Sequence, residues 1–144
     1  MTRIVVGVDG SEGSRRALRW ALEEARLHHA VLDAVHVVPA PPLLADPVVF
    51  PPPPEEQLRA EGGRVLDEML AGLETRDVEV QRIVAVGGAA RVLCEASRGA
   101  DLLVVGSRGL GGFKGLLVGS VAQQAIAHAS CAIALIVPGR HPRE

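Results

Sequence analysis

Aromatic residues are nearly absent from this sequence. Its 144 residues include one tryptophan, two phenylalanines and no tyrosine, yet 48% of them are hydrophobic. The core must therefore consist of Val, Leu, Ile and Ala side chains, which is typical of a parallel sheet buried on both faces. We expect residues 1–144 to form one domain, because a chain of this length can bury a core of its own.

The sequence also lacks a strong charge of either sign. The formal net charge is −2, and the arginines are scattered among acidic residues. Without a basic stripe or stacking aromatics, nucleic acid is a poor candidate partner. No apolar run reaches the roughly eighteen residues of a membrane span, and the first residues, MTRIVVGVDG, contain no segment typical of a signal peptide. We therefore expect a cytoplasmic protein without a membrane partner.

Residues that commonly carry metal or nucleophilic chemistry are few. Cys94 and Cys131 have no CxxC or Cys/His spacing, so we interpret them as buried free thiols. The five histidines show no ligand spacing, and we predict no metal site; His36 is interpreted as a strand-end residue. Because no serine or cysteine has an evident base and orienting acid, the sequence does not support nucleophilic catalysis.

Short apolar runs alternate with helical patterns along the whole chain. The runs predict strands, and the segments between them predict amphipathic helices, the first beginning at Ser11 or Ser14. Such alternation predicts an α/β fold of three layers, a Rossmann-like five-stranded parallel sheet in the order 3-2-1-4-5 with helices on both faces. The predicted strands are 3–8, 31–38, 78–86, 100–105 and 132–137, and the later helices are 55–75, a segment from Gly87-Gly88 to Gly99, and a segment beginning near Ser120.

A proline-rich segment separates the second strand from the next helix. Pro39 to Pro54 contain eight of the ten prolines. Proline has no N–H group and a fixed φ, so this segment cannot join a sheet interior or a helix. We expect an extended excursion that lies over the ligand site or on another subunit.

The stretch from Val104 to Ala129 carries the clearest chemistry. A strand end is followed by six glycines, including Gly106, Gly109 and Gly119, and then by a helix. A glycine loop that ends at a helix N-terminus presents N–H groups to a phosphate. The Ser120 hydroxyl is placed either to cap this helix or to bind phosphate, and the apolar face of the helix is predicted to comprise Val121, Ala122, Ala125, Ile126 and Ala129.

Asp9 ends the first strand, as Gly106 ends the fourth. In the order 3-2-1-4-5 these two strands are neighbours, and ligands bind at the carboxyl ends of such strands. Asp9 is also suited to a turn or a helix cap, and that role is compatible with ligand binding.

These residues resemble the universal stress protein family over almost the whole chain. The nucleotide signature of the family is G-x-x-G, nine residues, then G-S or G-T. Here it stands as Gly106-Ser107-Arg108-Gly109, Leu110 to Val118, and Gly119-Ser120, and the opening VVGVDGS is also similar. No lysine precedes Gly119-Ser120 as a Walker A loop requires, so a P-loop NTPase is disfavoured.

The resemblance implies an adenine nucleotide, most often ATP, bound alone or with Mg²⁺. The base would be bordered by Gly7, Val8, Val37 and Val105. Asp9 would accept hydrogen bonds from the ribose hydroxyls. The phosphates would be surrounded by Gly106, Arg108, Gly109, Gly119, Ser120 and Val121, although Arg108 is equally suited to be a solvated loop residue. The resemblance further implies a homodimer through the last strand, Ala132 to Val137.

The function that we predict is binding of an adenine nucleotide by a stress-response or regulatory protein. Hydrolysis is expected to be slow or absent, because the sequence shows no convincing base for the attacking water. Two alternatives remain open at this point. One is an enzyme of adenylate chemistry that uses the same loop, and the other is a dimeric interaction module that binds no nucleotide.

Overall fold

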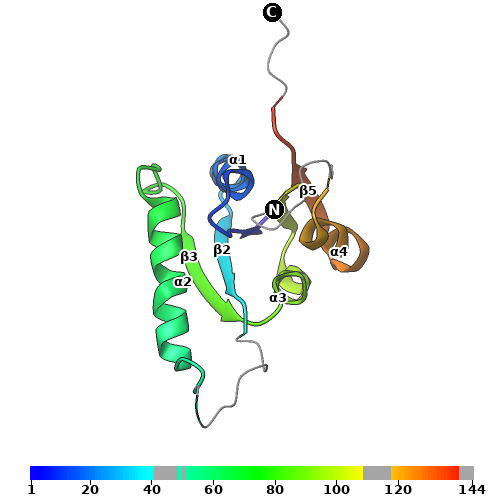
Figure 1. Ribbon diagram of the computed structural model, residues 1–144. Coiled ribbons are helices and arrows are strands. Elements are labelled where there is room, and N and C mark those ends of the chain that lie inside the picture. Colours follow the sequence, from blue (N-terminus) through cyan, green and yellow to red (C-terminus); the bar gives the residue numbers. More distant parts are fainter. Residues whose placement is uncertain (41–48, 50, 109–117, 140–144) are drawn as a thin grey trace, which may run out of the picture.

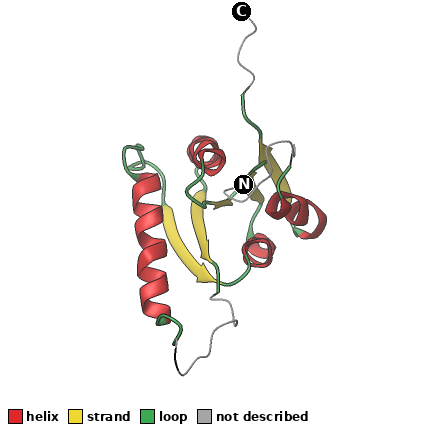
Figure 2. Ribbon diagram, in the orientation of Figure 1, coloured by secondary structure: helices red, strands yellow, loops and turns green. Residues whose placement is uncertain are grey.

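Helices and strands alternate in the described part of the chain. The computed structural model describes residues 1–40, 49, 51–108 and 118–139. The predicted α/β alternation is confirmed (Figure 2). The elements are β1 Arg3–Gly7, α1 Glu12–His28, β2 Val31–Val38, α2 Glu55–Leu70, β3 Val80–Val86, α3 Ala89–Ala96, the 3₁₀-helix η1 Ser97–Gly99, β4 Leu102–Gly106, α4 Ser120–His128 and β5 Ala132–Ile136.

The sheet has the predicted strand order. Its five described strands are all parallel and run β3-β2-β1-β4-β5. Val6 of β1 pairs with Ala34 on one side and with Val104 on the other. This register brings the carboxyl ends of β1 and β4 side by side, as the sequence predicted for Asp9 and Gly106.

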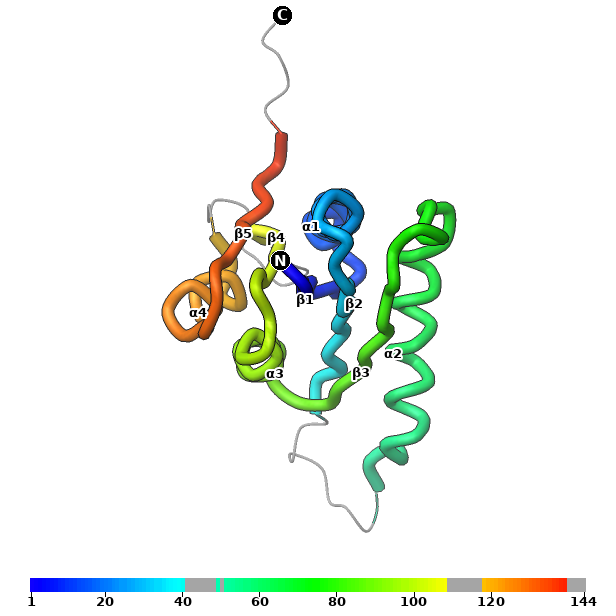
Figure 3. Tube along the Cα trace, turned by 180° about the vertical axis from the view of Figure 1, so that it is seen from behind, coloured from blue at the N-terminus to red at the C-terminus, as the bar shows by residue number. Residues whose placement is uncertain are grey.

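Helices cover both faces of the sheet. On one face, α1 and α2 pack on Ile4, Val6, Leu32 and Ala34 through side chains such as Leu18 and Leu66. On the other face, α3 and α4 pack on Val5, Val35, Leu103 and Val105 through Leu93, Ala122 and Ala125. Figures 1 and 3 show α2 beside β3 at one edge of the sheet and α4 beside β5 at the other. The two aliphatic cores follow from the alternation of side chains along each strand.

Several predicted boundaries and exposures were wrong. Helix α2 ends at Leu70 rather than Thr75, because Ala71 is extended and Gly72 adopts a φ of +80°. Strand β3 begins at Val80, β4 begins at Leu102, and β5 ends at Ile136. Ile126, which was assigned to the apolar face of α4, is 55% exposed, so α4 uses Ala122 and Ala125 as its buried residues.

The two cysteines are free, as predicted, but they are not buried. Cys94 lies on α3 and Cys131 directly before β5, and both are only partly covered. None of the helices in the described residues is long and apolar enough to cross a bilayer. Most of the proline-rich segment Pro39 to Pro54 lies outside the described residues, and Pro54 is the N-cap of α2.

Candidate functional site

A cavity opens at the carboxyl ends of β1, β2 and β4. Its volume is about 590 Å³, within the range typical of sites for small molecules. We call it the carboxyl-end cavity. Its described lining comprises Gly7, Val8, Asp9, Ser11, Ser14, Val35, His36, Val37, Pro39, Ala89, Leu93, Val105, Gly106, Ser107, Arg108, Gly119, Ser120, Val121 and Ala122.

The structure brings almost all of the predicted site residues to this one cavity. Ten of the eleven contribute to the lining, and the eleventh, Gly109, lies outside the described residues. They come from four places in the chain: the β1–α1 turn, the end of β2, the end of β4 and the start of α4. Their common location follows from the strand order, because neighbouring parallel strands end at the same edge of the sheet.

One wall of the cavity is apolar. Val35 and Val37 of β2, Val105 of β4 and Leu93 of α3 line it. Leu93 is only 4% exposed and packs with Val35 and Val105 in the core beneath α3 and α4. A flat, uncharged ring system is the kind of group that such a wall can accommodate.

A short hydrogen-bond network holds the turn between β1 and α1. Asp9 Oδ1 accepts hydrogen bonds from the Ser11 N–H, at 2.9 Å, and from the Ser11 hydroxyl. The Ser11 Oγ in turn accepts from the Ser14 N–H at 3.1 Å and caps α1. Gly10 makes the turn possible with a φ of +86°. The turn role that the sequence indicated for Asp9 is therefore confirmed, and its carboxylate lies at the cavity.

The N-terminus of α4 faces the same cavity. Its N-cap is Gly119, and no side chain caps it. Ser120 is the first helical residue, so the alternative in which its hydroxyl caps α4 was wrong. The N–H groups of the first turn have no acceptor within the helix, and the helix dipole adds positive potential there. This end of the cavity is suited to an anion.

Two glycines allow α1 to approach the segment after β4. A Cβ atom on Gly106 would lie 2.8 Å from the carbonyl carbon of Gly13, and one on Gly13 would clash with the carbonyl oxygen of Arg108. The glycine at position 106 is thus required by main-chain packing, whatever the cavity holds. This packing brings Arg108 to the cavity. Among the described lining residues, Arg108 is the single lysine or arginine.

Two further hydrogen bonds fix the ends of the glycine loop. The Ser107 N–H donates to the Ile136 carbonyl at 2.9 Å, and the Gly119 N–H donates to the Ser107 carbonyl at 2.5 Å. Ser107 is only 1% exposed. The entry to the loop and its exit into α4 are therefore joined directly at the cavity.

His36 lies near the end of β2, as predicted, and it also lines the cavity. Its Nδ1 is 2.7 Å from the carbonyl oxygen of Val8. Because a carbonyl only accepts, Nδ1 carries the hydrogen in this contact. His36 thereby ties the end of β2 to the residue that precedes Asp9.

Sequence reasoning missed part of the lining. Ser11 and Ser14 follow Asp9 closely, and Ser107 lies inside the glycine signature, so their positions in the sequence could have indicated them. Leu93 and Ala89 carry no such signal, because only the packing of α3 over the sheet brings them to the cavity.

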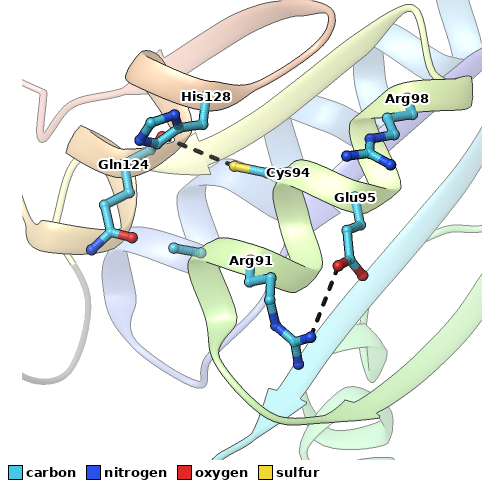
Figure 4. A pocket seen from close by; sticks show the side chains of 7 residues that line it. Arg91, Cys94, Glu95, Arg98, Gln124 and His128 are labelled. Atoms are coloured by element: carbon cyan, nitrogen blue, oxygen red, sulfur yellow. Dashed lines mark hydrogen bonds and ion pairs between the residues drawn. The ribbon is translucent and has the colours of Figure 1, made fainter.

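A second, smaller depression lies between α3 and α4. Its volume is about 410 Å³, and Figure 4 shows its side chains. Arg91 pairs with Glu95 at 4.0 Å, and the Cys94 thiol donates to the main-chain carbonyl oxygen of Gln124 at 3.9 Å. It contains none of the predicted site residues and has no aliphatic wall like that of the carboxyl-end cavity. Within the described ranges, no group of three or more His, Cys, Asp or Glu could hold a metal ion.

The fold and the cavity define a class of protein: a doubly wound α/β protein whose site lies where β1 and β4 send their helices to opposite faces. The universal stress protein family matches residues 1–137. The chain belongs to this family.

Relatives with known sequences support this assignment. A universal stress protein of Mycobacterium tuberculosis is 40% identical over 126 residues, which cover 83% of this chain and 40% of the relative. One of Thermus aquaticus is 34% identical over 136 residues, which cover 92% of this chain and 96% of the relative. The chain thus spans less than half the length of the mycobacterial relative that it matches.

Solved structures show the same fold. The universal stress protein UspA from Lactobacillus plantarum superposes with a TM-score of 0.76 at 26% identity, covering 94% of this chain and 97% of that protein. A universal stress protein solved in complex with cAMP superposes with a TM-score of 0.61 at 25% identity, covering 94% of this chain and 96% of that protein.

Proposed function

We propose that this protein binds an adenine nucleotide, ATP foremost, in the carboxyl-end cavity. The base lies against Gly7, Val8, Val37 and Val105. The ribose hydroxyls donate to Asp9. The phosphates lie at the N-terminus of α4, near Gly106, Arg108, Gly109, Gly119, Ser120 and Val121.

One observation carries this proposal: the uncapped N-terminus of α4 opens onto the same cavity as the Asp9 carboxylate and the apolar wall. A nucleotide needs three different environments in this order, a flat apolar surface, an acceptor for sugar hydroxyls and donors for phosphate. The described lining includes each of them: the apolar surface from β2, β4 and α3, the acceptor from the β1–α1 turn, and the donors from α4.

Among the helices whose first residues lie at the cavity, α1 and α4 differ in a way that supports a phosphate at α4 rather than at α1; α3, which begins at Ala89, is uncapped like α4. In helix α1 the Ser11 side chain accepts from the Ser14 N–H, and Glu12 in the first turn opposes the positive potential of the helix end. Helix α4 has neither a side-chain cap nor an acidic residue in its first turn. An anion is therefore favoured at α4 and disfavoured at α1.

The comparison with known proteins supports a purine nucleotide. A family member with the same fold has been solved with cAMP bound, whose base, sugar and phosphate are those that the cavity is proposed to hold. ATP would use the same donors at the N-terminus of α4 for its phosphates. Mg²⁺ would accompany the phosphates where ATP is bound as its magnesium complex.

We further propose that nucleotide binding is a signal and that any hydrolysis is slow. Among the described lining residues Asp9 is the single carboxylate, and Ser11 already occupies its Oδ1. A general base must reach the proton of the attacking water, whereas the role proposed for Asp9 is to bind the sugar. The output would be a stress-response or regulatory interaction in the cytoplasm.

A homodimer through the last strand completes the proposal. Strand β5 is an edge of the sheet in the described chain, and one of its sides pairs with β4. The other side offers main-chain donors and acceptors to a second copy. The segment proposed to pair is Ala132 to Val137.

Thermal unfolding with and without ATP and Mg²⁺ tests the proposal. At a ligand concentration about a hundred times its dissociation constant, binding adds roughly 2.7 kcal/mol to the free energy of unfolding. The matched variant is Asp9→Asn, which keeps the size of the side chain and should reduce the ATP-induced shift. An unchanged melting temperature for the wild-type protein would count against nucleotide binding, and release of AMP and pyrophosphate would favour adenylate chemistry instead.

A further inference from the structure

The carboxylate proposed to bind the ribose is held by a neighbouring side chain. Both bonds from Ser11, from its N–H at 2.9 Å and from its hydroxyl, go to the same oxygen of Asp9. A carboxylate on a short side chain can rotate about two bonds, and paired donors on one oxygen remove that freedom. Asp9 is thus presented to the cavity in one orientation.

The hydroxyl of Ser11 has a single hydrogen, and the structure determines where it points. The Ser14 N–H donates to Ser11 Oγ at 3.1 Å, so the oxygen accepts from the helix while its own hydrogen goes to Asp9. Successive donors of this kind polarise one another. The network therefore connects the N-terminus of α1 to the carboxylate through the Ser11 hydroxyl.

The main chain of Asp9 is held as well. Its N–H donates to Ser14 Oγ at 3.2 Å, and the same hydroxyl donates to the Ser11 carbonyl at 3.1 Å. Ser14 is only 5% exposed, and both serines line the cavity. The first turn of α1 thereby fixes Asp9 at its backbone and at its side chain.

We propose that Ser11 is a positioning residue that orients Asp9 toward the vicinal hydroxyls of a ribose, so that the cavity selects ribonucleotides over nucleotides lacking those hydroxyls. This inference rests on the proposed nucleotide site. Ser11 itself acts through Asp9 and contributes to selectivity for the sugar, while the base and the phosphates are held by other parts of the cavity.

The test compares ATP with 2′,3′-dideoxy-ATP by isothermal titration calorimetry on the wild-type chain and on Ser11→Gly. Glycine is a good N-cap residue and fits the extended conformation of position 11, whose φ is −75° and ψ 161°. Helix α1 should therefore still form in the variant, which lacks the CH2OH side chain but keeps the N–H at position 11. Ser11→Thr retains an Oγ and is the rescue variant.

The wild-type protein is expected to bind ATP about tenfold or more tightly than the dideoxy analogue, which is the ratio that one hydrogen bond to a charged group gives. In Ser11→Gly that ratio should fall to within about threefold because ATP binds more weakly, with little change for the analogue, and Ser11→Thr should restore it. If Ser11 had a merely structural role, the substitution would weaken the binding of both ligands equally and leave the ratio of their affinities unchanged.

The outcomes separate this inference from the function on which it rests. If Ser11→Gly keeps the wild-type ratio of affinities for ATP and the dideoxy analogue, the positioning role is overturned, while nucleotide binding stands. Equal binding of both ligands by the wild-type protein would also overturn the positioning role, because Asp9 would then not discriminate between the two sugars. If the wild-type protein binds neither ligand, the proposed nucleotide site itself is overturned.

Discussion

Two adjacent glycines in α2 give a sharp test of how this helix packs. A Cβ atom on Gly62 would lie 2.5 Å from Val84 Cγ1, 3.0 Å from Val38 Cγ2 and 3.2 Å from His36 Cδ2, whereas one on Gly63 would meet nothing within 4 Å. Gly62 is buried against β2 and β3, and both glycines lie inside the helix. The variants Gly62→Ala and Gly63→Ala therefore add the same methyl group in two different environments.

The expected free energies follow from these contacts. Alanine is better than glycine in a helix interior by about 0.8–1 kcal/mol, so Gly63→Ala should stabilise the protein by about that amount. Gly62→Ala has the same gain but must displace stiff β-branched side chains, and overpacking of this kind costs about 1–3 kcal/mol. The two variants should differ by about 1–3 kcal/mol, with Gly62→Ala the less stable.

Urea unfolding followed by circular dichroism measures this difference directly. The midpoint should rise for Gly63→Ala and remain unchanged or fall for Gly62→Ala, with similar slopes for both. Gly63→Ala serves as the matched control for helix propensity. Equal stabilisation by the two substitutions would refute the close approach of α2 to β2 and β3.

Two further predictions concern the site and the edge opposite to it. Gly106→Ala should destabilise the protein by about 1–3 kcal/mol and weaken ATP binding, because its Cβ would press on the main chain of Gly13. Chemical unfolding measures the loss of stability, and calorimetry measures the loss of affinity. A variant with the stability and affinity of the wild type would contradict this packing. Asp101→Asn should lower stability at neutral pH, because hydrogen bonds from the N–H groups of Thr2 and Arg3 and from the Thr2 hydroxyl lower the pKa of Asp101 below its ordinary 3.8. The lowered pKa means that the ionised carboxylate stabilises the fold above pH 3.8 and that this stabilisation is lost as the carboxylate protonates at lower pH. The difference in stability between Asp101→Asn and wild type should therefore shrink as the pH falls below 3.8, and equal stabilities at neutral pH would contradict the prediction.

Much of the fold could be predicted because local signals and topology agree. The run Val31 to Val38 is rich in β-branched residues and is closed by Pro39, and β2 has those bounds. Ser11 was one of two proposed starts for α1, and it is the N-cap. The strand order then places Asp9 and Gly106 at neighbouring carboxyl ends without any further information.

The rest depends on packing that one sequence does not display. The helical pattern of α2 continues past Leu70, but Gly72 takes a left-handed conformation there. Ile126 has the spacing of a buried residue, yet α4 is short and lies beside the edge strand β5, which leaves that position exposed. Gly13 resembles an ordinary helix residue until the carbonyl of Arg108 is found against it.

Native mass spectrometry of the purified chain mixed with ATP is the most direct measurement of whether the carboxyl-end cavity holds a nucleotide. We predict a species heavier than the polypeptide by the mass of one ATP, which denaturation releases and which Asp9→Asn depletes at the same ATP concentration. A spectrum with only the mass of the polypeptide at every ATP concentration would contradict the account.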